Sequence, residues 1–178
     1  MKMTASILLF MMLFAAAAAA HDLGGIAPVE GDDGWKTVEM EGMTLSWREM
    51  EDAFSFRAEA PTEGWVAVGF GGGPAMKEAS MIIGYADGDG AHYRDDHGTS
   101  PVSHSPDTDL GGTDDIMEAD IQETDGTTTF SFTLPMEPSD ELDPALTPGE
   151  TIRVLAAWGN QDGFTGMHSE AHTAELEL

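Results

Sequence analysis

The sequence predicts an all-β protein, with a single antiparallel β-sandwich over residues 35–178. Three observations support this fold class. Short segments alternate apolar and polar residues, Gly, Pro and Asp separate these segments, and no stretch sustains an apolar period of 3.6 residues. About eight to ten short strands at such spacing are typical of two antiparallel sheets packed face to face.

The individual strand candidates share this period of two. Residues 127–134, for example, place Phe130, Phe132 and Leu134 on one face and hydroxyl side chains on the other. The full set is residues 43–47, 54–58, 65–70, 81–86, 127–134, 152–158 and 171–178. Residues 96–113 carry no strand pattern and predict a long polar loop, and residues 139–146 predict a single helical turn at most.

The first twenty residues predict a secretory signal peptide. Lys2 precedes an apolar run over residues 7–20, which ends in three alanines suited to cleavage after Ala20. This run is too short and wrongly flanked for a stable membrane anchor. We therefore expect residues 21–34 to be a loose lead-in to the folded domain. We also expect an exported protein, periplasmic or extracellular, whose mature form does not span a membrane.

The composition is strongly acidic. The chain has 33 Asp and Glu residues against 7 Lys and Arg residues, a formal net charge of −26, and loss of Lys2 with the signal makes it −27. Nucleic acid is not an expected partner, because phosphate binding needs a basic surface. The acids are spread along the mature chain, which suits a solvated surface in a halophilic or marine source. They also suit docking to a basic partner.

Catalytic motifs are missing from the sequence. It has no Cys, so a cysteine nucleophile, a thiolate metal site and covalent haem attachment are excluded. It has neither a Gly-x-Ser-x-Gly elbow nor a glycine-rich phosphate loop before a helix. A pair of carboxylates does not indicate a catalytic site in a chain with 33 acidic residues. We therefore do not expect an enzyme that acts alone.

Two loop residues have side chains that bind metals. Met76 follows the glycine-rich run 71–74 in a polar loop, where a thioether either packs or ligates a soft metal or haem iron. His168 lies in a second loop, between two strand candidates. Solvent exposure is the default for an isolated histidine in a loop.

The order of several segments resembles the DOMON domain. The core of the resemblance is residues 64–70, the glycine loop, Met76 and residues 79–85. The later segments follow in the same order: residues 93–98, 103–107, 125–134, 155–159 and 167–169. The resemblance covers nearly all of residues 35–178. It implies an immunoglobulin-like β-sandwich that binds haem or sugars and serves as an exported module in redox systems.

The haem-binding cytochrome type of this family, as in the cytochrome domain of cellobiose dehydrogenase, implies a ligand pair. Met76 and His168 stand at the positions of the axial ligands of a non-covalent b-type haem. Such a six-coordinate iron carries electrons to a redox partner protein and leaves no open site for substrate. Met167 departs from the Tyr that many relatives carry, and Met81 and His172 are rival ligands.

A second function remains open from the residues, a carbohydrate- or ligand-binding module without haem. Exposed aromatic side chains would then bind the ligand, and the tryptophans available are Trp35, Trp47, Trp65 and Trp158. Trp65 and Trp158 lie on strand candidates with a buried pattern, which disfavours this reading.

Three metal sites are also possible from the residues. Asp107, Asp109 and Glu118 match positions 1, 3 and 12 of an EF-hand calcium loop, although no helices flank them. Signal cleavage would make His21 the first residue, and its amino group and imidazole would bind copper if a second histidine folded back on them. A weaker histidine cluster would use His92, His97 and His104.

Overall fold

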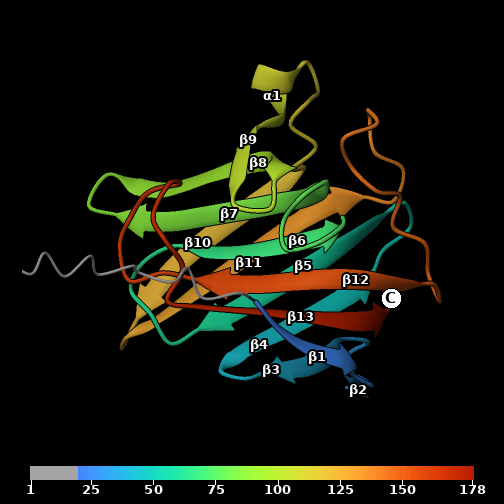
Figure 1. The fold of residues 1–178 in the computed structure, drawn as a ribbon. Helices are drawn as coiled ribbons and strands as arrows, with labels where there is room; N and C mark the ends of the chain where they lie inside the picture. Colours follow the sequence, from blue (N-terminus) through green and yellow to red (C-terminus); the bar gives the residue numbers. More distant parts are fainter. Residues whose placement is uncertain (1–19) are drawn as a thin grey trace, which may run out of the picture.

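The computed structural model describes residues 20–178, which form two β-sheets packed face to face (Figure 1). The predicted β-sandwich is therefore confirmed. The predicted signal peptide lies outside the described residues, apart from Ala20. Within residues 20–178, no helix is long and apolar enough to cross a membrane.

The two sheets contain seven and six strands. The seven-stranded sheet runs, from edge to edge, β1 (His21–Gly25), β13 (Glu170–Glu177), β12 (Thr151–Trp158), β6 (Val66–Gly71), β7 (Ala79–Asp87), β8 (Gly90–Ser100) and β9 (Ser103–Pro106). The six-stranded sheet runs β10 (Glu118–Thr124), β11 (Thr127–Pro135), β5 (Ala53–Ala60), β4 (Met43–Glu49), β3 (Lys36–Met40) and β2 (Val29–Glu30). All neighbouring strands are antiparallel except β1 and β13, which are parallel.

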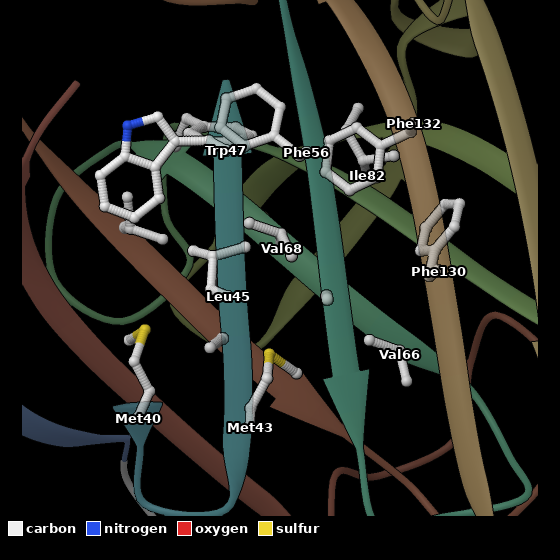
Figure 2. Close-up of a cluster of buried hydrophobic side chains, with 14 of the residues drawn as sticks. Met40, Met43, Leu45, Trp47, Phe56, Val66, Val68, Ile82, Phe130 and Phe132 are labelled. Carbon is white, nitrogen blue, oxygen red and sulfur yellow. The ribbon is translucent and has the colours of Figure 1, made fainter. Parts of the chain in front are cut away.

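The core fills the space between the sheets. Alternate residues of each strand point inward, and Figure 2 shows Trp47, Phe56 and Phe132 from the six-stranded sheet beside Val68 and Ile82 from the other. Phe56 stacks on Phe132 with ring centroids 5.3 Å apart and is 1% exposed. Burial of such large apolar side chains is the main force that holds the two sheets together.

The segment 96–113 differs from the predicted polar loop. It contains the end of β8, all of β9 and the one helix of the described residues, α1 (Asp107–Leu110). The buried positions of β8 include Asp95 and Asp96, so the strand has no apolar alternation to reveal it. Pairing with β7 over residues 90–97 and with β9 beyond them decides its conformation instead.

The helical turn predicted at residues 139–146 is also wrong, since this segment holds no helix. The Asp140 carboxylate accepts hydrogen bonds from the backbone N–H groups of Leu142 (2.7 Å) and Thr113 (2.6 Å). This turn competes with a helix for the backbone donors.

The predicted loose lead-in, residues 21–34, contains two short edge strands instead. β1 lies beside β13, with His21 opposite His172, and β2 pairs with β3 (Figure 1). The Gly- and Asp-rich sequence has low strand propensity, so only pairing with an existing sheet edge makes it extended.

Candidate functional site

The outward face of the seven-stranded sheet is lined by small and apolar residues. Val66, Val68 and Val154 point into the core, so the residues between them in the same strands point away from it. Where β6 is paired with both β7 and β12, the outward residues are Ala67, Gly69, Met81, Ile83, Leu155 and Ala157. We call this set the outer apolar face. A Cβ atom on Gly69 would lie 3.0 Å from Met81 Cγ, so the floor of this face is closely packed.

The loop of residues 72–78 carries Met76 and covers one end of this face. Arg153, which points outward like Leu155, donates from Nη1 to the Gly71 carbonyl and from Nη2 to the Ala75 carbonyl, both at 3.1 Å. Gly98 of β8 lies against the Met76 carbonyl so closely that any Cβ atom there would overlap it. These contacts hold the half-buried Met76 over the outer apolar face.

The loop of residues 159–169 carries His168 and covers the other end. Its Phe164 ring lies edge-on to Tyr85 with centroids 5.1 Å apart, and the Arg94 guanidinium lies 4.4 Å from the Phe164 centroid. The Trp65 indole packs against Gly166, where a Cβ atom would lie 3.1 Å from its nitrogen. His168 is half-buried, and its Nδ1 is buried without a hydrogen-bond partner.

The sheet topology explains this arrangement. β6 and β12 are antiparallel neighbours, so the loops that follow them leave the sheet at opposite ends (Figure 1). Both loops contact outward residues, through Arg153 at one end and Tyr85 at the other. The structure therefore sets Met76 and His168 at the two ends of one apolar surface.

The two rival ligands have different positions. Met81 is on the floor of the outer apolar face and is 8% exposed. His172 lies opposite Ala156 in the β12–β13 pairing, and Ala156 belongs to the core. Because side chains at paired positions share a face, His172 points to the inner side of the sheet, away from Met76.

An ion-pair network borders this face on β8. The Asp96 carboxylate accepts from Arg94 Nη2 at 2.6 Å and lies in contact with His104 Nδ1. Burial alone raises the pKa of Asp96, but the hydrogen bonds from His104 and Arg94 outweigh it and lower the pKa. Arg94 thereby links an ionised carboxylate to Phe164 in the His168 loop.

Two buried carboxylates and a half-buried one gather on the other side of β8. The side chains of Asp95, Asp107 and Asp143 offer oxygens that all lie within 4.8 Å of one another. Burial, with the charge of Asp143 added to it, raises the pKa of Asp95 to about 8 and that of Asp107 to about 7. Asp95 Oδ2 accepts from the Asp115 N–H at 3.0 Å, and both oxygens of Asp107 are buried without a partner.

The predicted EF-hand-like set is not assembled. Asp107 lies with Asp95 and Asp143, whereas Asp109 and Glu118 are exposed. Asp107 begins α1 and Glu118 begins β10, so the chain does not wrap around one point as a calcium loop requires.

The three histidines considered as a cluster have separate partners. His92 Nε2 lies 2.9 Å from Asp87, His97 Nδ1 lies 2.9 Å from the Leu142 carbonyl, and His104 contacts Asp96. They form no shared group among the metal-binding clusters of residues 20–178.

The tryptophans do not form an exposed binding platform. Trp47, Trp65 and Trp158 are at most 5% exposed, as the strand patterns of Trp65 and Trp158 predicted. Trp35 is half-buried, and the guanidinium groups of Arg48 and Arg57 each lie 5.0 Å from its ring centroid.

Two cytochrome domains are among the solved structures that share this fold. The cytochrome b domain of pyranose dehydrogenase from Coprinopsis cinerea has a TM-score of 0.56 at 13% identity, over 75% of this chain and 75% of that one. The cytochrome domain of Myriococcum thermophilum cellobiose dehydrogenase has a TM-score of 0.57 at 10% identity, over 85% of this chain and 88% of that one. No curated protein sequence matches the chain. The family model of the DOMON domain matches residues 39–159, and the chain therefore belongs to the DOMON domain family.

Proposed function

We propose that this protein is an exported electron carrier that binds a non-covalent b-type haem, with Met76 and His168 as the axial ligands. One observation carries the proposal: the loops of both residues fold over the same apolar face from opposite ends. A thioether and an imidazole that reach one apolar surface from its two ends would hold the haem iron.

The residues present fit a haem. The buried Nδ1 of His168 lacks a partner, which is costly for a polar atom unless something else satisfies the ring. The outer apolar face supplies a floor of small and apolar side chains, and the chain has no Cys for covalent attachment. When bound, a Met/His-ligated haem supplies one-electron redox chemistry at a raised reduction potential.

The protein's own residues hold the two ligands in place. Arg153 and Gly98 fix the Met76 loop, and Phe164 with Trp65 fixes the His168 loop. Neither loop needs to be ordered by the ligand, so the entropic cost of binding is reduced. The apolar floor would keep water from a bound haem, which would favour its less charged ferrous state.

A redox partner is part of the proposal, because an electron carrier needs a donor and an acceptor. The mature chain would carry a net charge of −27, so a basic surface on the partner would be attracted over long range. The alternative function is a sugar-binding module without haem. It would have little aromatic surface for its ligand, because most of the tryptophans are buried.

Absorption spectroscopy tests the proposal. Protein expressed with haem supplied should show an intense Soret band and, after reduction, the sharp bands of a low-spin b-type haem. His168→Ala should abolish or severely weaken haem binding. Met81→Leu and His172→Ala are the matched controls and should leave the spectrum nearly unchanged. A wild-type protein without a Soret band would overturn the haem function, and loss of haem only in His172→Ala would overturn the ligand assignment.

A further inference from the structure

A second group of metal-binding side chains lies on the opposite side of β13 from the outer apolar face. His21, Glu41 and His172 each offer a ligand atom, and these atoms lie within 4.8 Å of one another. His21 Nδ1 is 3.2 Å from Glu41 Oε2, and His172 Nδ1 is 3.8 Å from the same oxygen. The three residues come from β1, the β3–β4 turn and β13, so the group bridges the two sheets at an open edge.

Strand pairing fixes the two histidines side by side. β1 and β13 are parallel neighbours, with His21 directly opposite His172. Paired residues of adjacent strands point to the same face, and the two imidazole centroids are 6.3 Å apart. The register of β1 on β13 thus brings together two residues that lie 151 positions apart in the sequence.

The buried and unpaired imidazole of His172 is the feature that indicates a bound ligand. The residue is 3% exposed, its ring packs on Trp158 with centroids 5.7 Å apart, and neither ring nitrogen has a hydrogen-bond partner. A buried polar group left unpaired costs free energy in the folded state. A bound cation coordinated by the ring would remove that cost.

Glu41 has an unusual backbone conformation, and its carboxylate lies beside both imidazole rings. It is the first residue of the two-residue turn between β3 and β4, with φ of +45°. Gly, Asn and Asp are the usual residues at such a position, because Gly has no Cβ atom to crowd the backbone and Asn and Asp hydrogen-bond to it locally. Gly42, with φ of +115°, completes the turn against Trp158, where a Cβ atom would lie 3.4 Å from the indole.

From this geometry we infer that His21, Glu41 and His172 form a copper(II) site, and that the α-amino group freed by cleavage after Ala20 is its fourth donor. Two imidazoles, an amine and a carboxylate make the N₃O set that copper(II) prefers in tetragonal geometry. Copper also binds such donors more tightly than the other divalent first-row metals do. The site is independent of the haem, because His172 faces the inner side of the sheet.

Calorimetric titration with CuCl₂ tests the inference, with protein that begins at His21. One copper per chain should bind, and the paramagnetic resonance spectrum should show nitrogen hyperfine structure. His21→Ala and Glu41→Gln should each weaken binding at least tenfold. Both residues are exposed, so these variants should fold normally. His172→Ala should weaken binding at least as much, and His92→Ala, which removes a half-buried histidine outside the site, is the control.

A version with one extra glycine before His21 separates the amine from the side chains. It should lose at least tenfold in affinity while keeping a weaker one-to-one site. Equal affinity with and without the glycine would overturn the amine as a donor. Unchanged affinity in His21→Ala and His172→Ala would overturn the whole site. The absorption spectrum of each variant is recorded beside its copper titration. A loss of copper affinity with an unchanged spectrum is then distinct from a failure of haem binding.

Discussion

The charge on Asp95 should destabilise the folded protein at alkaline pH, and Asp95→Asn should remove this effect. Asp95 is 3% exposed and shares its site with Asp107 and Asp143. The asparagine keeps the oxygen that accepts from the Asp115 N–H but carries no charge. The variant therefore measures how much the charge on Asp95 destabilises the folded state.

The magnitude follows from linkage between protonation and folding. The pKa of Asp95 is raised from 3.8 to about 8 by burial and by the neighbouring Asp143. The folded state then binds the proton more tightly than the unfolded state does. The stabilising effect is complete below pH 4 and is lost as the pH rises through 8. One pKa unit is worth about 1.4 kcal/mol, so the loss is on the order of 5 kcal/mol.

Urea unfolding at pH 5 and pH 8.5, at constant salt and with a chelator present, measures this effect. Wild type should be markedly less stable at pH 8.5. Asp95→Asn should gain about 2 kcal/mol or more over wild type at pH 8.5, and much less at pH 5. Asp109→Asn removes an exposed charge and controls for net charge. The reasoning is refuted if the two variants gain equally at pH 8.5, or if Asp95→Asn gains as much at pH 5.

Four further outcomes are expected. Phe56→Ala removes a ring packed between the sheets and should cost about 3–5 kcal/mol in urea unfolding, whereas a loss below 1 kcal/mol would contradict its central place. Gly98→Ala should displace the Met76 loop and lower haem affinity in a haem titration, and an unaltered affinity would mean that the loop position is irrelevant. Met76→His should keep the haem but lower its midpoint potential in a redox titration, because the thioether favours ferrous iron, and an unchanged potential would argue against Met76 as ligand. Mass spectrometry of exported protein should find His21 first, and an intact Met1 would refute the signal peptide.

Local pattern was sufficient for the strands that bury apolar side chains. Residues 127–134 alternate Phe130, Phe132 and Leu134 with hydroxyl residues, and β11 spans Thr127–Pro135. The same rule failed for β8, whose buried positions include Asp95 and Asp96, and for β1, a short glycine-containing edge strand. Their conformation comes from pairing with a neighbour, which no local window contains.

The residues of the candidate site also differ in whether the sequence alone could identify them. Met76 and His168 followed from the order of segments along the chain, but the sequence left His172 as a rival to His168. Only the pairing of β12 with β13 assigns His172 to the inner side, beside His21 and Glu41. Nor could the sequence select Asp95, Asp107 and Asp143 among 33 acids. Residue type and periodicity are local properties, whereas face and proximity depend on strand register, which packing between distant segments decides.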